Sequence, residues 1–245
     1  MFEILKDGSR QLGIELSDKQ VNDFIEYSRL LLDWNEKINL TAITEDFEIA
    51  TKHFLDSMSA LETGFVEGSV IDVGCGAGFP GLVLKIAKPD INLTLLDSLN
   101  KRINFLREVY NKLNISDVQF EHMRAEDGGR IMREKFDTVV SRAVANMTVL
   151  SELCIPFLKI GGRFLALKGP MAESELNDAK RAIKILGGEI EDVFDAKIPY
   201  TDLSHKIIII KKVRHTPIQY PRKAGIVTKS PIDSCYNLKQ IKKKQ

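Results

Sequence analysis

The segment "DVGCGAGFPG", Asp72 to Gly81, combines a carboxylate with several glycines in a pattern that could hold a ligand. Its glycines stand at positions 74, 76, 78 and 81, directly after the apolar run Val70–Ile71. Glycine readily adopts positive φ angles and lets the backbone approach a bound molecule closely. We therefore expect this segment to be a loop that follows a strand and cradles a ligand.

Two common phosphate-binding motifs do not fit this loop. A Walker motif would need Gly-Lys-Ser/Thr, and a dinucleotide-binding motif would need a third glycine where Phe79 stands. A phosphate would also use the free N–H groups at the start of the next helix. Pro80 removes one of these donors, and Phe79 crowds the position. The pattern therefore favours a ligand without a phosphate at this point.

A second carboxylate, Asp97, closes the next predicted strand, 25 positions after Asp72. In doubly wound folds an acid at this place accepts hydrogen bonds from ribose hydroxyls. Loop and acid together indicate S-adenosylmethionine, whose apolar parts Phe79 could contact. If the loop is considered without Asp97, the alternative is that it is an ordinary tight turn between a strand and a helix. The predicted cofactor-binding residues of these segments are Asp72, Gly74, Gly76, Gly78, Phe79 and Asp97.

Further candidates follow the third and fourth predicted strands. Ala125 and Glu126 would lie on the same carboxyl edge of the sheet, where open sheets bind ligands. Glu126 or its backbone could hold an adenine, although a solvated loop acid is the alternative. Arg142 could bind the cofactor's carboxylate, the methyl acceptor or both. The alternative for Arg142 is an exposed charge at the end of a strand.

An alternation of strands and helices must position these residues. Strands are predicted at residues 69–73, 93–97, 118–122, 136–141 and 163–168, and helices near 82–88, 101–112, 146–158 and 172–186. Two strand-like runs near 190–198 and 206–213 follow without a helix between them and predict an antiparallel hairpin at the sheet's edge. The expected fold is α/β, with a doubly wound, mostly parallel seven-stranded sheet.

Residues 1–65 are predicted to be helical and to pack on the main domain. Ser17 and Gln20 have the spacing of a capping box at the start of a helix. A second helix is expected from about residue 45 to 62, with Thr44 as its cap. The expected division is a helical region 1–65, a cofactor-binding domain 66–215 and a basic segment 216–245.

Composition and charge restrict the class of protein. The chain is 44% hydrophobic and 28% charged, as is typical of a globular protein, and no apolar run approaches the ~20 residues of a membrane span. Its three cysteines are far apart and form no CxxC motif, which predicts no zinc site and a cytoplasmic location. Ten basic residues and one acidic residue follow position 210, so this segment carries +9 and the rest −8. Such a segment indicates a polyanion partner, or alternatively a solubilising tail.

Motifs along most of the chain resemble a known family. They are "WNEKINLTAI" (34–43), "HFLDS" (53–57), "DVGCGAGFPG", "LLDSLNKRINFL" (95–106), "RAE" (124–126), "FDTVVSRAVA" (136–145), "LALKG" (165–169) and "YPRKAGIVTKSP" (220–231). In this order they are similar to the RsmG family, also called GidB, the bacterial 16S rRNA guanine-N7 methyltransferases. The tail after Pro231 is outside the resemblance.

The resemblance implies a class I S-adenosylmethionine-dependent methyltransferase fold with an N-terminal helical part, and small-subunit rRNA as the substrate. The family's cofactor-binding positions fall here on Gly74, Phe79, Ala125, Glu126 and Arg142. Guanine N7 carries a lone pair and no proton, so direct displacement on the methyl group would need no general base. Arg142 is the predicted catalytic residue. Catalysis would come mainly from holding N7 in line with the methyl group, while N7 itself stays free to attack.

Several basic residues are candidates for contact with the RNA. They are His53, Arg124, Lys168, Arg222, Lys223 and Lys229. His53 and Asp56 lie one helical turn apart, and a hydrogen bond that fixes the N-terminal part is the alternative for them. Three other functions remain open: a methyltransferase acting on a protein or small molecule, a non-catalytic protein that binds the cofactor or rRNA, and, least favoured, a nicotinamide dehydrogenase.

Overall fold

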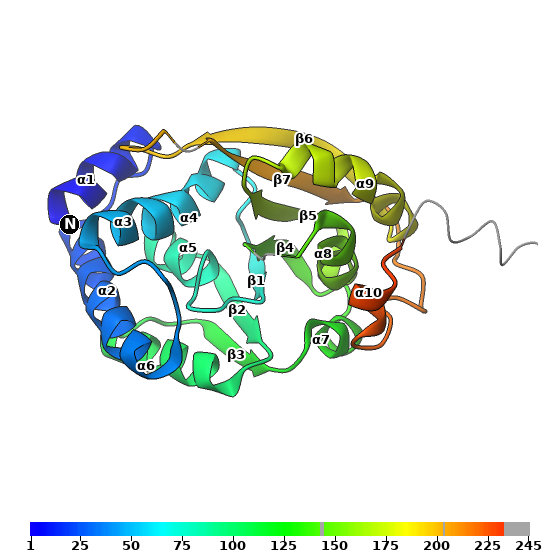
Figure 1. Cartoon of the computed structure of the whole chain (residues 1–245), viewed down its shortest axis with the longest axis horizontal. Coiled ribbons are helices and arrows are strands. Elements are labelled where there is room, and N and C mark those ends of the chain that lie inside the picture. The colour runs from blue at the N-terminus through cyan, green and yellow to red at the C-terminus, as the bar shows by residue number, and fades with distance from the viewer. Residues whose placement is uncertain (143–144, 203, 233–245) are drawn as a thin grey trace, which may run out of the picture.

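Seven strands form one sheet at the centre of the chain (Figure 1). The computed structural model describes residues 1–142, 145–202 and 204–232. Their order in the sheet is β3-β2-β1-β4-β5-β7-β6. The strands are β1 (Ser69–Val73), β2 (Asn92–Asp97), β3 (Val118–His122), β4 (Phe136–Ser141), β5 (Leu158–Lys168), β6 (Gly188–Lys197) and β7 (Ser204–Lys212).

Strands β1 to β5 pair in parallel, whereas β7 is antiparallel to both β5 and β6. The predicted fold class is therefore confirmed, including the antiparallel hairpin at one edge. The structure corrects one length, because β5 begins at Leu158 and not at residue 163. The additional residues at the start of β5 come immediately after the short helix η3 (Ile155–Phe157).

Helices cover both faces of the sheet, as the period of two along the strands requires. On β7, Ile207 and Ile209 point into one apolar core, and Ile208 and Ile210 point into the other. The first core lies under the N-terminal helices, α5 (Gly81–Ala87) and α6 (Asn100–Leu113). The second lies under α8 (Met147–Cys154) and α9 (Ala172–Ile185). A further helix, α7 (Ala125–Ile131), was not predicted from the sequence.

The N-terminal helices pack on the first face of the sheet and share its core. After α1 (Phe2–Gln11), α2 (Asp18–Ile38) begins with the predicted capping box, in which Ser17 and Gln20 bond reciprocally. The side-chain nitrogen Nε2 of Gln20 also donates to the backbone carbonyls of Ile86 and Ala87, at the end of α5. One side chain therefore stabilises the start of α2 and the end of α5.

The second N-terminal helical stretch is irregular, and its predicted cap is wrong. It runs as α3 (Asp46–Glu48), the π-helical η1 (Ile49–Leu55), α4 (Asp56–Met58) and the 3-10 segment η2 (Ser59–Thr63). The N-cap is Glu45 and not Thr44, and no side chain caps this start. The π-helical turn brings Asp56 and His53 of the same stretch beside the carboxyl end of β4.

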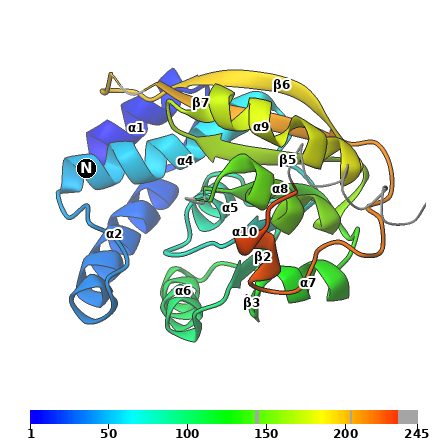
Figure 2. The same cartoon turned by 45° about the vertical axis from the view of Figure 1, so that its right-hand side comes forward.

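The segment after β7 returns along α8 and contains the short helix α10 (Ile226–Lys229) (Figure 2). The guanidinium of Arg133 donates to the carbonyls of Thr216, Pro217 and Tyr220, which holds this segment in place. No helix within the described residues is long and apolar enough to cross a membrane. The lysines at 239, 242, 243 and 244, as well as Cys235, lie outside the described residues.

Candidate functional site

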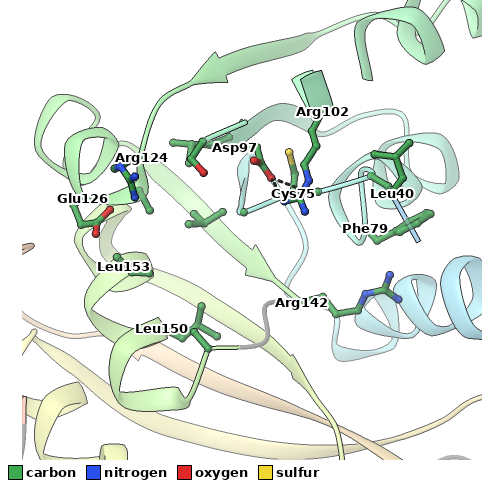
Figure 3. Close-up of a pocket in the computed structure, with 18 of the residues that line it drawn as sticks. Leu40, Cys75, Phe79, Asp97, Arg102, Arg124, Glu126, Arg142, Leu150 and Leu153 are labelled. Atoms are coloured by element: carbon green, nitrogen blue, oxygen red, sulfur yellow. Dashed lines mark hydrogen bonds and ion pairs between the residues drawn. The ribbon is translucent and has the colours of Figure 1, made fainter. Parts of the chain in front are cut away.

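A cavity of about 560 Å³ opens at the carboxyl ends of β1, β2 and β4 (Figure 3). Its walls come from the glycine loop, the turn before α3, the π-helical turn, the start of α7 and one side of α8. Side chains or backbone from the following residues line it: Leu40, Thr41, His53, Gly74, Cys75, Gly76, Phe79, Asp97, Arg102, Arg124, Ala125, Glu126, Arg142, Leu150, Leu153 and Thr228.

The glycine loop forms the floor of the cavity. Gly74, Gly76 and Gly78 all have positive φ, at 77°, 57° and 94°. A Cβ on Gly74 would meet no atom within 4 Å, so the open space above this residue is available to a ligand. A Cβ on Gly78 would instead collide with the Tyr27 hydroxyl. Gly74 and Gly76 therefore face the cavity, whereas Gly78 allows close packing against α2.

Asp72 lies behind the loop and not on the cavity wall. It is fully buried, and its Oδ2 accepts a hydrogen bond from the backbone N–H of Gly81 at 2.7 Å. Its Oδ1 has no hydrogen-bond partner. Burial raises the pKa of this carboxyl group to about 7. Asp72 therefore fixes the start of α5 and does not contact the cavity directly.

Asp97 lies where the ribose-binding prediction requires, at the end of β2 and on the cavity wall. Its Oδ2 accepts from the N–H of Gly76 at 2.9 Å and from Arg102 at 3.2 Å. Its Oδ1 accepts from the N–H of Leu99 at 2.9 Å. Each carboxylate oxygen can accept about two hydrogen bonds, so Oδ1 retains acceptor capacity for a ligand hydroxyl.

The predicted adenine-binding pair begins α7. Arg124 is the N-cap residue, and Ala125 and Glu126 are the first residues of the helix. Glu126 is only 8% exposed, and its carboxylate faces the cavity opposite Leu150 and Leu153 of α8 (Figure 3). This end of the cavity therefore combines an apolar wall with one carboxylate and the start of a helix.

Arg142 follows β4 directly and lies at the other end of the cavity (Figure 3). Its Nη1 donates to Oδ2 of Asp56 at 2.7 Å and to the carbonyl of Lys52 at 3.1 Å. Its Nη2 lies 3.3 Å from Nδ1 of His53, and its guanidinium lies 5.0 Å from the centre of the Phe79 ring. The side chain is therefore held by three groups of the π-helical stretch and by one aromatic ring.

Asp56 connects Arg142 to a third element. Its Oδ1 accepts a hydrogen bond from Nδ1 of His205, at the start of β7, at 2.6 Å. Burial alone would raise the pKa of Asp56, but the hydrogen bond from His205 and the charge of Arg142 lower it below its usual value. The bond to Asp56 in turn raises the pKa of His205. The carboxylate therefore stays ionised and joins the N-terminal helices, β4 and β7.

His53 lines the cavity and stacks on Phe79, with ring centres 4.5 Å apart. Its Nε2 lies 2.8 Å from the hydroxyl oxygen of Thr41. Burial, and then the nearby charge of Arg142, lower the pKa of His53 to about 4. The hydrogen bond between His53 and Asp56 that the sequence offered as an alternative does not form in the described part of the chain; both side chains instead contact Arg142.

The candidate RNA-binding residues divide into two groups. Lys168 is buried, and its Nζ contacts Glu175 at 2.7 Å and the carbonyl of Ala145 at 2.8 Å. Arg222 forms a bidentate ion pair with the fully buried carboxylate of Glu152. These two side chains therefore hold the fold together. The others, apart from His53, are exposed: Arg124, Lys223 and Lys229.

Sequence reasoning missed Thr41, Arg102, His205 and Thr228, which the structure brings to the cavity or to its supporting network. Thr41 lies inside the quoted motif "WNEKINLTAI", and that was its only signal. His205 has no comparable signal, because its partner Asp56 is 149 positions away in the chain.

Comparisons with known proteins agree with this geometry. A family described as GidB, rRNA small subunit methyltransferase G, matches residues 20–202. Proteins named ribosomal RNA small subunit methyltransferase G from Alkaliphilus oremlandii and Clostridium perfringens are each 52% identical to this chain. Each alignment covers 94% of this chain and 98% of the relative.

Solved structures share the fold at low sequence identity. One is TYW2 from M. jannaschii in complex with AdoMet, at 15% identity and a TM-score of 0.52, covering 65% of this chain and 77% of that one. Another is TrmN from Thermus thermophilus, at 16% identity and a TM-score of 0.51, covering 67% and 53%. Both have the class I fold found here.

Proposed function

The chain belongs to the rRNA small subunit methyltransferase G family and is an S-adenosylmethionine-dependent methyltransferase; on that premise we propose that it methylates N7 of a guanosine in 16S rRNA of the small ribosomal subunit. The observation that carries the proposal is the cavity itself. It combines an open glycine floor and a ribose-type acid at one end with an anchored arginine at the other.

The cavity residues fit S-adenosylmethionine. The open space above Gly74 accepts the ligand, and Oδ1 of Asp97 has acceptor capacity left for a ribose hydroxyl. Ala125, Glu126 and the apolar side chains of Leu150 and Leu153 would hold the adenine. Bound there, the cofactor supplies an electrophilic methyl group on a positively charged sulfur.

The proposed transfer needs no general base, since guanine N7 has a lone pair and no proton. The ionisable groups on the cavity wall support this. His53 is bonded to Thr41 and Arg142 and has a pKa of about 4. Burial holds the pKa of the Cys75 thiol well above its usual value, so no thiolate nucleophile forms near neutral pH. The residues would therefore act by orienting the substrates.

Arg142 is the proposed orienting residue. Its two Nη1 hydrogens are used by Asp56 and by the carbonyl of Lys52, which fixes the plane of the guanidinium. Among the described residues, no acceptor takes its Nε hydrogen or its second Nη2 hydrogen, so both remain for a ligand. Holding the nucleophile and the methyl group ~3–3.5 Å apart and in line is a large part of what such a site can contribute.

The exposed cations near the cavity are the proposed contacts to the RNA backbone. Thr228 lines the cavity, and Lys223 and Lys229 lie on the same C-terminal segment. Arg124, at the start of α7, also lines the cavity. Lys168 and Arg222 are not among the proposed RNA contacts, because Glu175 and Glu152 already pair with them. The proposal includes a cytoplasmic location, where small subunits are assembled, and neither a metal nor a membrane partner.

The test uses isotopically labelled S-adenosylmethionine with small subunits or rRNA from a strain that lacks this methyl group. RNA nucleosides are then separated by mass spectrometry, and labelled 7-methylguanosine is the expected product. The variant Arg142→Ala should abolish the signal, whereas Arg29→Ala, an exposed arginine on α2, should not reduce it. Cofactor binding without a labelled RNA base would overturn the acceptor assignment and favour a protein or small-molecule acceptor, or a non-catalytic role.

A further inference from the structure

The protonation of His53 follows from its neighbour Arg142. A guanidinium group has only donors, so the nitrogen of His53 that it contacts must accept. That nitrogen is Nδ1, 3.3 Å from Nη2 of Arg142. Because the pKa of His53 lies near 4, the ring is neutral around pH 7 and carries its single hydrogen on Nε2. Arg142 thereby selects one tautomer of His53.

The tautomer decides what the hydroxyl of Thr41 can do. Nε2–H of His53 donates to the Thr41 Oγ1 at 2.8 Å, and the backbone N–H of Ile43 donates to the same oxygen at 3.0 Å. A hydroxyl oxygen has two lone pairs, and both are used. The hydroxyl hydrogen of Thr41 therefore has to find an acceptor elsewhere.

No acceptor for this hydrogen occurs in the described part of the chain, and Thr41 lines the cavity. The turn that carries Thr41 is fixed, because the side-chain oxygen of Asn35 accepts from the backbone N–H groups of Leu40 and Thr41 at 2.7 and 2.9 Å. The hydroxyl is thus a donor directed at the ligand space. Together with the free N–H groups of Arg142, it makes this end of the cavity a set of donors.

We propose that Thr41 is a ligand-binding residue, whose hydroxyl donates a hydrogen bond to an oxygen of a bound substrate that can only accept. The inference rests on the proposed function, which supplies two such oxygens: the carboxylate of S-adenosylmethionine, and O6 of the guanine whose N7 attacks. His53 is the positioning residue in this arrangement. An adenine has an amino group in place of O6. Its N–H donors would then meet the donors of Thr41 and Arg142, and no hydrogen bond could form between them.

The first arm of the test measures ligand binding by calorimetry with S-adenosylhomocysteine and with 5′-methylthioadenosine, which lacks the amino-acid part. The variants are Thr41→Val, Thr41→Ser, which keeps the hydroxyl, and Thr44→Val as a matched control on the exposed part of the same turn. If the carboxylate is the partner, Thr41→Val weakens binding of S-adenosylhomocysteine roughly 10- to 100-fold and leaves 5′-methylthioadenosine unchanged. A general disturbance of the cavity would weaken both ligands equally.

The second arm measures binding of unmethylated small subunits by filter retention, together with KM and kcat for them. If O6 is the partner, Thr41→Val leaves both calorimetric affinities intact and weakens subunit binding or kcat/KM about 3- to 10-fold. Thr41→Ser should match the wild type in either arm. If Thr41→Val is unstable, Thr41→Ala is used in its place.

The proposal is overturned if Thr41→Val behaves like Thr44→Val in both arms, or if it weakens 5′-methylthioadenosine as much as S-adenosylhomocysteine. A wild-type protein that transfers no methyl group to RNA would end the proposed function alone. The calorimetric arm would then still decide whether Thr41 binds the carboxylate, and no effect there would end this inference as well.

Discussion

At one end of the cavity, Asp97, Ala125 and Glu126 follow consecutive strands of the sheet and bond mainly to nearby backbone. At the other end, Arg142 depends on Asp56 of the N-terminal helices and, through it, on His205 of β7. The polar groups of the first end come from positions at or just after the ends of strands along a single sheet edge. The second requires three segments that come together only in the finished fold.

This difference separates the ways in which the two ends can fail. A change at the sheet-built end should alter ligand affinity with little effect on folding. A change at the end closed by the helices should alter both, because buried charges there compensate one another across elements. Five substitutions, taken in order of decreasing effect, test whether the two ends differ in this way.

Asp56→Ala should have the largest effect. It leaves Arg142 and His205 without the carboxylate that both contact, and breaking such a buried pair costs about 3–5 kcal/mol. We expect this loss of unfolding free energy in urea titrations, together with loss of methyl transfer. Asp46→Ala, an exposed carboxylate in the same helical stretch, is the control. Equal stability of the two variants would remove the basis for the contrast.

His53 should make stability depend on pH. Its pKa is about 4 in the folded protein and ~6.5 in the unfolded chain, so between these values only the unfolded chain binds the proton. Stability should therefore fall as the pH drops from 6.5 to 4, by up to about 3 kcal/mol. His53→Gln should flatten this slope in urea titrations at several pH values.

His205 supplies the opposite control for that experiment. Its pKa is raised, so its contribution is present at low pH and is lost as the pH rises through the folded value. His205→Gln should therefore remove a gain in stability that appears as the pH falls towards 6.5, and should leave the slope between pH 6.5 and 4 unchanged. A slope in His53→Gln that equals the wild-type slope would contradict the burial of a neutral His53.

Asp97→Asn tests the sheet-built end. The substitution removes the charge that the Gly76 N–H, Arg102 and the predicted ribose hydroxyl share. We expect binding of S-adenosylhomocysteine to weaken roughly 10- to 100-fold by calorimetry, with a small change in stability. Asp127→Asn, an exposed acid on α7, should keep wild-type affinity. A variant that unfolds before it loses affinity would show that both ends are structural.

Ser17→Ala should have the smallest effect. It removes a capping box far along the chain from the cavity residues, which costs about 1 kcal/mol of stability. Affinity for S-adenosylhomocysteine should not change. A large drop in affinity would mean that the packing of α2 behind the glycine loop, through Tyr27, is coupled to the cavity.

What the sequence could predict was local. The strands at 69–73, 118–122 and 136–141 have the predicted bounds, because short apolar or alternating runs between turn signals specify them. The Ser17–Gln20 box was equally readable, since its two partners are three residues apart. The glycine loop and Asp97 belong to the same class, as position after a strand defines them.

The rest depended on contacts between distant segments. In the sequence, Arg222 is one of many basic residues near the C-terminal end. Nothing in that pattern indicates that it pairs with Glu152, which lies buried on α8. The π-helical turn that aims Asp56 and His53 at Arg142 has no signal of its own, and neither has the helix that begins at Ala125. Tertiary packing, and not local propensity, determines these features.

The strand order β5-β7-β6 has a consequence for synthesis. Chains emerge N-terminus first, so β6 leaves the ribosome before β7, yet in the sheet β6 pairs only with β7. The glycine loop and Asp97 can assemble as soon as the first strands are made. Asp56 meets His205 only after β7 has inserted beside β5. The residues of the glycine loop and Asp97 are therefore translated well before Arg142 can be held in place, and the site is complete only once β7 has been made.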